Sequence, residues 1–189
     1  VEAGVGLIPE GGGCKEFAIR AADWAAQSVT PREVMNYLQP VFMNIAMAKV
    51  AKSALEAIDM GFAKPTDTIL FNANELLYVA IREARAMADA GYAPPLVPRG
   101  VPVAGRTGIA TFEMMLLNMK EGGMISAHDY RVAKAAATAL CGGDIETGSQ
   151  VDEEWLLTVE RNLFVELLKT PETQARIKQM LETGKPLRN

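Results

Sequence analysis

VEAGVGLIPEGGGCKEF, residues 1–17, is the part of the sequence that says most about the fold and the chemistry. A glutamate, Glu2, precedes a run of alternating glycine and aliphatic residues that ends at Pro9. Three consecutive glycines, Gly11–Gly13, then open a predicted helix. Glycine adopts backbone conformations that other residues avoid, and the first N–H groups of a helix can face an electron-rich group. The stretch is therefore a candidate binding or catalytic segment.

Two other interpretations of this stretch differ in how well they fit its spacing. A dinucleotide-binding fingerprint is excluded, because the glycines at Gly4 and Gly6 would require a third glycine at position 9, where Pro9 stands. An ordinary buried strand end followed by a turn, with Glu2 as a solvated residue, fits the spacing as well. From the spacing alone, this second interpretation stays open.

Length and composition limit the class of protein. A chain of 189 residues with 49% hydrophobic residues suits one domain or a large piece of one. The net charge of −4 and the absence of a basic patch argue against a nucleic-acid partner, and no apolar stretch approaches the roughly 20 residues that span a bilayer. Cys14 and Cys141 form no C-x-x-C pair, so reduced thiols in a reducing compartment are expected.

The sequence starts inside this motif, without methionine or a secretory signal. We therefore expect a C-terminal fragment of a longer polypeptide.

Most of the chain is predicted to be helical, beginning with an alanine-rich helix over Gly13–Gln27. Pro40 should kink or split the helix that follows. Residues 107–120 form a further predicted helix, residues 68–71 a short strand and residues 92–105, with four prolines, a loop. The other helix starts are recognised by pairs of capping residues: Thr30 with Pro31, Ser53 with Glu56, Asn72 with Glu75, Ser126 with Asp129, Ser149 with Asp152, and Thr170 with Pro171.

Residues 1–17 resemble the second catalytic segment of the crotonase (enoyl-CoA hydratase/isomerase) superfamily. Matching Pro9 and Gly11–Gly13 to that pattern places Glu2 on the catalytic glutamate of the family, whereas Glu10 stands where hydratases most often have glycine. The segment 53–62 and the end of the chain also resemble crotonases. The last residues, GKPLRN, resemble the tail of fused β-oxidation proteins that carry a 3-hydroxyacyl-CoA dehydrogenase before a crotonase domain.

The resemblance implies a mainly α fragment, the C-terminal helical part of an α/β crotonase fold, with at most two short strands. Residues 1–71 would be the second half of the crotonase core. Residues 72–189 would be a helical region that serves assembly and covers acyl-CoA.

The function implied is hydration of 2-enoyl-CoA, with Glu2 as the catalytic residue and with Gly6, Pro9, Glu10 and Gly11 binding substrate. The second glutamate and the oxyanion donors have no counterpart here, so the isolated chain is expected to be inactive. A helical assembly module without chemistry and an enoyl-CoA isomerase are the alternatives. Glu10 is either a second acid or base, or a solvated residue near a helix N-terminus.

No cofactor is expected in this segment, because coenzyme A belongs to the substrate and NAD would bind a missing N-terminal domain. No metal is expected either: His128 has no suitably spaced partner and is interpreted as a surface residue. Cys14 is interpreted as a small buried thiol, and Lys15 as a partner of Glu10 or of a CoA phosphate.

The expected partners are acyl-CoA and the rest of the parent polypeptide or another copy, in a cytoplasmic homo-oligomer without nucleic acid or a membrane span. Because the sheet that the apolar run would meet is missing, residues 1–17 are expected to be disordered or buried against another chain.

Overall fold

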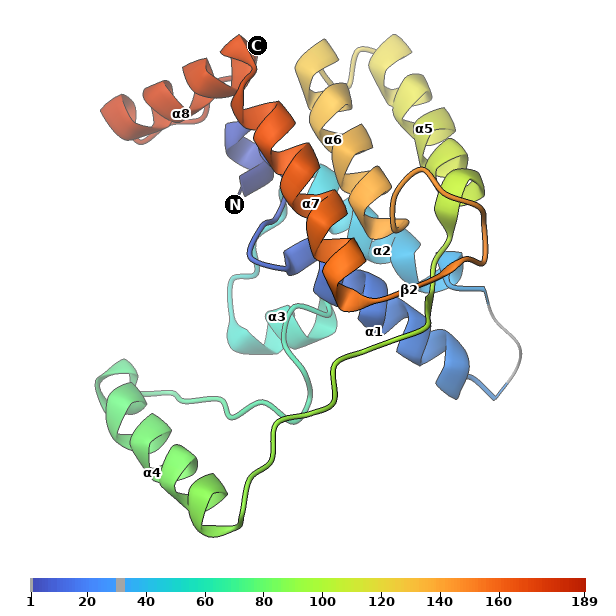
Figure 1. Ribbon diagram of the computed structural model, residues 1–189. Helices are drawn as coiled ribbons and strands as arrows, with labels where there is room; N and C mark the ends of the chain where they lie inside the picture. Colours follow the sequence, from blue (N-terminus) through green and yellow to red (C-terminus); the bar gives the residue numbers. More distant parts are fainter. Residues whose placement is uncertain (1, 30–32) are drawn as a thin grey trace. The chain divides into compact units, whose positions relative to one another are not determined.

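The computed structural model describes residues 2–29 and 33–189. The chain divides into two compact units, residues 1–50 together with 98–189, and residues 51–97. Within the described residues, regular structure consists of eight α-helices, two short 3-10 helices and two strands of two residues each. The predicted mainly α fold with at most two short strands is confirmed (Figure 1).

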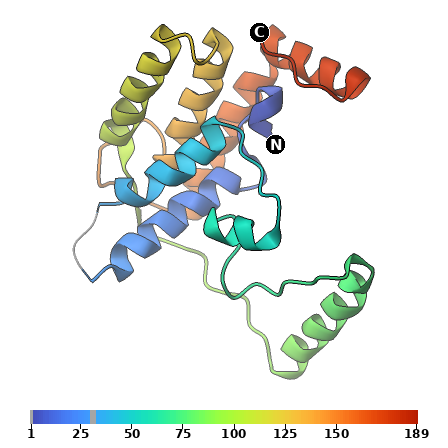
Figure 2. The same cartoon turned by 180° about the vertical axis from the view of Figure 1, so that it is seen from behind.

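Helix α6 is central to the first unit, since it contacts α1, α2, α5 and α7. Its buried side is made mostly of alanines, including Ala133, Ala136 and Ala137, and small side chains let neighbouring helices approach closely. Figure 2 shows α1 and α2 side by side on the other face of this unit. The helices of the unit are η1 (Glu2–Val5), α1 (Gly13–Gln27), α2 (Met35–Ala46), α5 (Gly105–Glu121), α6 (Ala127–Leu140), α7 (Glu153–Leu168) and α8 (Pro171–Thr183).

The core of this unit joins residues far apart in the sequence. Phe42 of α2 and Phe112 of α5 are both fully buried, with ring centroids 4.2 Å apart. Helix α1 has the predicted bounds, and its Phe17, Ala18 and Ala22 are buried. The alanine-rich character of α1 and α6 therefore serves close packing.

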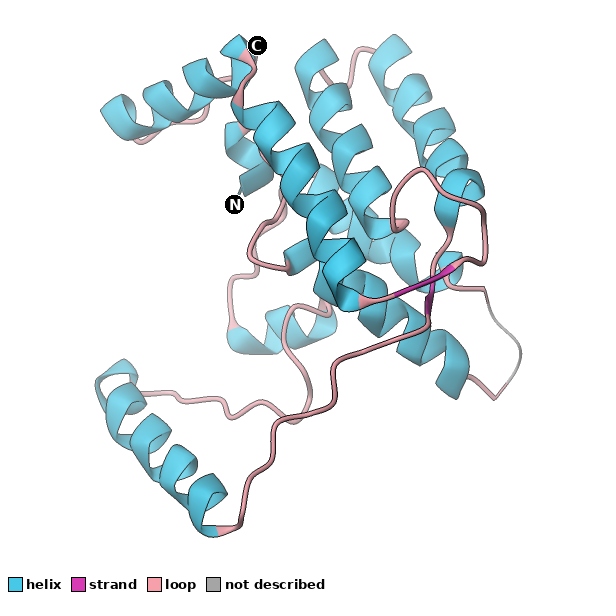
Figure 3. Ribbon diagram, in the orientation of Figure 1, coloured by secondary structure: helices cyan, strands magenta, loops and turns pink. Residues whose placement is uncertain are grey.

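Two short strands were not located from the sequence, and the first lies inside the loop predicted over residues 92–105. Strand β1 (Val101–Pro102) pairs antiparallel with β2 (Gln150–Val151), with Val101 opposite Val151 (Figure 3). The predicted strand over residues 68–71 is wrong: these residues have no regular structure, and Phe71 is 96% exposed. An apolar run forms a strand only where another segment pairs with its backbone, and a local pattern does not reveal that partner.

Several predicted helix starts are confirmed by their hydrogen bonds. Ser126 and Asp129 form a reciprocal capping box, and the side chains of Ser53 and Thr170 accept from the third residue of α3 and α8. Helix α7 is capped by Asp152 rather than by Ser149. The predicted start at Thr30 and Pro31 lies outside the described residues.

Helix α2 runs without a break through Pro40, so the predicted split does not occur. Proline leaves the carbonyl of the residue four positions earlier without its helical donor. That residue is Asn36, and both it and Pro40 are exposed, so water can take the place of the missing donor.

The second unit contains α3 (Ala54–Asp59), η2 (Ala73–Glu75) and α4 (Leu76–Asp89). None of its residues, 51–97, is buried. The predicted boundary between residues 71 and 72 falls inside this unit, and the division into regions 1–71 and 72–189 stays a prediction. Among the helices of the described residues, none is long and apolar enough to cross a membrane.

Candidate functional site

The segment predicted to carry the chemistry is folded against the helices of its own chain. Glu2 opens η1 and is exposed, whereas Leu7 and Ile8 are buried. The backbone N–H of Leu7 donates to the carbonyl of Glu2 at 3.0 Å, and η1 contacts α8. The prediction that residues 1–17 are disordered or covered by another chain is therefore wrong for Leu7 and Ile8.

Gly6 is held in a tight polar cluster. Its φ is +85°, and its carbonyl accepts a 2.8 Å hydrogen bond from the Thr173 hydroxyl. A Cβ at this position would lie 2.8 Å from Thr173 Oγ1 and 3.0 Å from His128 Nε2. Glycine is thus required here by the packing of η1 against α6 and α8.

His128 belongs to the same cluster and is only 5% exposed, so its interpretation as a surface residue is wrong. Its Nε2 lies 2.9 Å from Thr173 Oγ1. Because the Thr173 hydroxyl donates to Gly6, its oxygen must accept from an Nε2–H of the imidazole. Burial lowers the pKa of His128, and the positive charge of Arg176 lowers it further, which favours the neutral ring.

Arg176 connects this cluster to the end of the chain. The side chain is 2% exposed, and its Nη1 lies 2.8 Å from Asp129 Oδ1. Its Nε donates to Asn189 Oδ1 at 2.7 Å. Burial alone would raise the pKa of Asp129, but the Ser126 backbone and Arg176 hold it below its usual value. The buried cation is therefore matched by a carboxylate and by the terminal residue.

The N-terminus of α1, opened by the glycine cluster, is occupied by a carboxylate of the protein itself. The backbone N–H of Gly12 donates to Glu160 Oε1 at 2.8 Å, and that of Lys15 donates to Glu160 Oε2 at 2.9 Å. Glu160 comes from α7 and is 3% exposed. A helix N-terminus favours an anion, and here α7 supplies it.

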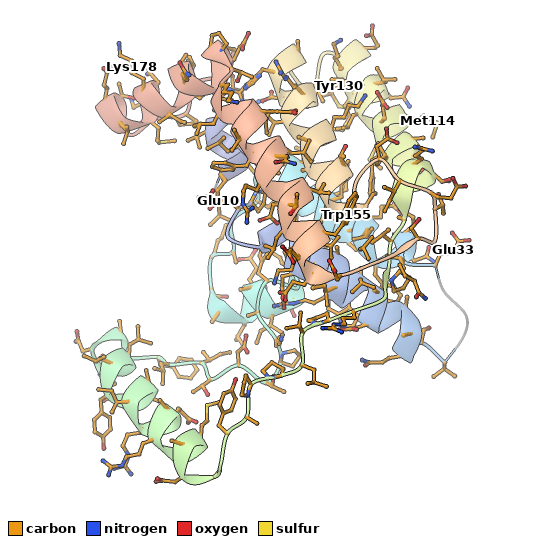
Figure 4. The ribbon with its side chains drawn as sticks, in the orientation of Figure 1. Glu10, Glu33, Met114, Tyr130, Trp155 and Lys178 are labelled. Atoms are coloured by element: carbon orange, nitrogen blue, oxygen red, sulfur yellow. The ribbon has the colours of Figure 1, made fainter. Side chains whose placement is uncertain are left out.

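The other predicted site residues lie along the loop before α1. Glu10 and Gly11 are exposed and Pro9 is partly buried. The carbonyl of Glu10 accepts from the N–H of Gly13 at 3.3 Å, and Figure 4 shows the Glu10 side chain on this loop. Of the predicted site residues, Glu2, Glu10 and Gly11 are thus exposed and Pro9 is partly buried, while Gly6 is buried in the interior.

Two neighbouring side chains have structural partners. Lys15 Nζ donates to Glu153 Oε1 at 2.7 Å. Burial would lower the pKa of Lys15, but Glu153 and Glu16 together raise it. Cys14 is fully buried, and burial, with the charges of Glu160 and Glu2, raises the pKa of its thiol. Its interpretation as a buried thiol is confirmed.

A cavity of about 550 Å³ lies elsewhere in the first unit, between α1, α2, β1 and the start of α5. Its walls are mainly apolar and its polar lining includes Glu33, Thr107 and Thr147. None of the predicted site residues lines it. Figure 4 shows Glu33, at this cavity, on the opposite side of the unit from Glu10. The cavity and the predicted site are therefore separate.

Three residues that organise this region were missed by sequence reasoning, Glu160, Thr173 and Arg176, and a fourth, His128, was assigned to the surface. Glu160 did leave a signal, because it stands at helical spacing between Leu156 and Leu167, which are both buried. A charge in such a row predicts a buried partner. Within residues 2–29 and 33–189, no group of three or more His, Cys, Asp or Glu side chains is placed to hold a metal ion.

Comparison with known proteins gives one relevant similarity. A probable 3-hydroxyacyl-CoA dehydrogenase of Bacillus subtilis (strain 168) is 44% identical to this chain over 189 residues. The match covers 100% of this chain but 23% of the relative, so the chain spans about a quarter of the relative's length. No family model matches the chain. No solved structure matches it either.

This similarity corrects the predicted function. The expectation of a hydration step on 2-enoyl-CoA is wrong, because the relative is named as a dehydrogenase, and no crotonase family model matches. The expected likeness to a polypeptide with a 3-hydroxyacyl-CoA dehydrogenase is confirmed in its coarser form: the chain matches part of a protein of that name.

Proposed function

We propose that this chain is a helical part of a larger 3-hydroxyacyl-CoA dehydrogenase of fatty-acid metabolism. The observation that carries the proposal is the 44% identity to one portion of the Bacillus subtilis relative, sustained over all 189 residues. Identity over a whole chain requires the same elements in the same order. The chain therefore takes the structural place of that portion in a protein of the same kind.

In this proposal the nicotinamide cofactor binds outside the chain. A dinucleotide-binding fold needs a mostly parallel sheet with a glycine-rich turn. The only sheet in the described residues pairs two antiparallel strands of two residues, and Pro9 interrupts the glycine pattern. The buried groups Glu160 and Arg176 are engaged with their own chain. The chain then contributes packing surfaces rather than hydride transfer.

The roles predicted for Glu2, Gly6, Pro9, Glu10 and Gly11 stay predictions. Gly6 is buried beneath Thr173, so a substitution there changes the fold first. The exposed Glu10 and Gly11 are the part of the loop within reach of a ligand from solvent.

A chimera tests the proposal. The matched stretch of the Bacillus subtilis relative is replaced by this chain, and NAD-dependent oxidation of 3-hydroxybutyryl-CoA is followed by NADH absorbance. We expect the kcat/KM of the chimera to stay within about tenfold of the relative, which corresponds to about 1.4 kcal/mol in activation free energy.

The control replaces the same stretch with a glycine–serine linker of equal length and should lose activity. A folded chimera that does not oxidise the substrate, beside an active relative, would contradict the proposal. Binding of NAD to the 189-residue chain in a titration would contradict the placement of the cofactor outside it.

A further inference from the structure

We propose that the apolar face of α4 is a docking surface, covered by another part of the same longer polypeptide through an apolar patch on that part. The inference rests on the proposed function, because it takes the chain to be one region of a larger protein. It concerns the second unit, residues 51–97, which the predicted site does not include.

Helix α4 has one continuous apolar stripe. With about 3.6 residues per turn, seven of its apolar residues fall within about 140° of the circumference. Alanines at the middle of the stripe, Ala80 and Ala84, leave room for a close neighbour. The stripe consists of Leu76, Leu77, Ala80, Ile81, Ala84, Met87 and Ala88.

This stripe has no partner within its own unit. Leu77 is 72% exposed and Ile81 is 58% exposed, and no residue of α4 is buried. Phe71 and Leu96, which precede and follow α4 in the chain, are 96% and 93% exposed. An isolated helix of this length is marginal in water, and exposed apolar patches mark interaction sites, so the stripe needs a covering surface.

The polar side of α4 argues against a membrane surface as the occupant. It carries Arg82 and Arg85 beside Glu83 and Asp89, two positive and two negative charges. Helices that lie on a membrane are rich in lysine and arginine on this side. The balanced charges instead suit a helix whose apolar side faces protein and whose polar side faces water.

The length of the relative favours the same polypeptide over a second copy. More than three quarters of the relative lies outside the stretch that this chain matches. A covalently joined partner is present at an effective concentration in the millimolar range, so it covers the stripe at any protein concentration. A second copy would leave the stripe bare on dilution.

Two single-cysteine probes of the same type test the proposal. Ala84→Cys lies in the stripe and Ala86→Cys lies on the other side of α4, and both alanines are exposed in this chain. The native Cys14 and Cys141 are fully buried and give little background. The rate of maleimide labelling is measured for each variant, in the 189-residue chain and in the chimera described above, with the unsubstituted proteins as background.

In the 189-residue chain we expect both probes to react at similar rates at every concentration. In the chimera, Ala84→Cys should react at least about tenfold more slowly than Ala86→Cys, because labelling then needs local opening. Where the chimera does not fold, the same protection is sought by adding the relative without its matched stretch to the 189-residue chain.

Equal labelling of both probes in the folded chimera, or no protection by the added relative, would overturn the inference. Protection of Ala84→Cys that appears in the 189-residue chain as its concentration rises would assign the stripe to a second copy and would also overturn it. None of these readouts uses dehydrogenase activity. A chimera that is inactive but in which Ala84→Cys is protected would therefore contradict the proposed function and not this inference.

Discussion

At the scale of single residues, the buried polar groups are matched within the chain. Glu160, Thr173, Arg176 and His128 are all under 6% exposed, yet each has a hydrogen-bonded or charged partner. Among the described residues, no buried side-chain nitrogen or oxygen lacks a hydrogen bond. An unpaired buried polar group lowers stability. These pairs therefore stabilise the fold, and removal of one residue leaves its partner buried without a hydrogen bond.

Because its pKa is lowered in the folded chain, His128 should make stability dependent on pH. Burial is the main cause of its lowered pKa and Arg176 adds to it, while Glu172 and Asp129 oppose them. The unfolded chain, with a histidine pKa near 6.5, therefore binds a proton more readily than the folded chain. Stability should be full above about pH 6.5 and fall as pH drops through the folded pKa. Urea unfolding at several pH values measures this.

Replacement of His128 by glutamine supplies the control, since an amide N–H can still donate to Thr173 but does not titrate. The sequence has one histidine, so the substituted chain should lose most of the decline between about pH 7 and pH 5. An unchanged decline would assign the pH dependence to carboxylates such as Asp129.

At the scale of elements, the helices differ in how their ends are completed. Helices α6 and α8 are capped by a local residue, Ser126 or Thr170. Helix α1 follows Gly12, which has no side chain to cap it, and obtains its acceptor from Glu160 of α7. The start of α1 is therefore stabilised by a neighbouring element and depends on the packing of α7.

Glu160→Ala removes both carboxylate oxygens and leaves the backbone N–H groups of Gly12 and Lys15 without an acceptor. We expect the free energy of unfolding to fall by about 2–3 kcal/mol, in line with the loss of hydrogen bonds to a buried charge. Chemical unfolding followed by circular dichroism measures the change. Glu166→Ala is the matched control, because Glu166 is an exposed glutamate of the same helix. Equal stability of the two variants would show that the contacts of Glu160 contribute nothing.

At the scale of the whole molecule, the two units differ in how much apolar surface they bury. The first unit contains Phe42, Phe112 and the alanine side of α6 in its core. The second unit contains no buried residue. Buried apolar contacts are the main source of resistance to local opening, so the two units should open independently and at different cost.

Hydrogen exchange on the 189-residue chain measures this difference. Backbone amides of α4, residues 76–89, should exchange much faster than those of α6, residues 127–140, because no residue of α4 is buried, whereas eight residues of α6 are. The comparison is made at low protein concentration to exclude self-association. Comparable protection of the two helices would mean that the second unit is stable by itself.

Most helices could be located from the sequence, because their signals are local. A capping residue and its partner three positions later are neighbours in any chain, as Ser126 and Asp129 show. The bounds of the alanine-rich helix α1 were likewise predicted from local signals. Errors arose where a signal needs a distant partner, as for the strand predicted over residues 68–71.

In the candidate site, too, local features could be predicted from the sequence and contacts with distant residues could not. The sequence alone established that Glu2, Pro9 and the glycines form one segment leading into a helix. Its surroundings depend on residues 145 to 167 positions away. Glu160 accepts from the N–H groups of Gly12 and Lys15 across separations of 148 and 145 residues, and Thr173 donates to Gly6 across 167. The spacing around Glu160 signals a buried charge, but no local pattern identifies its partner, because such contacts form only when packing brings the helices together. Tertiary structure therefore decided that these amides meet an internal carboxylate.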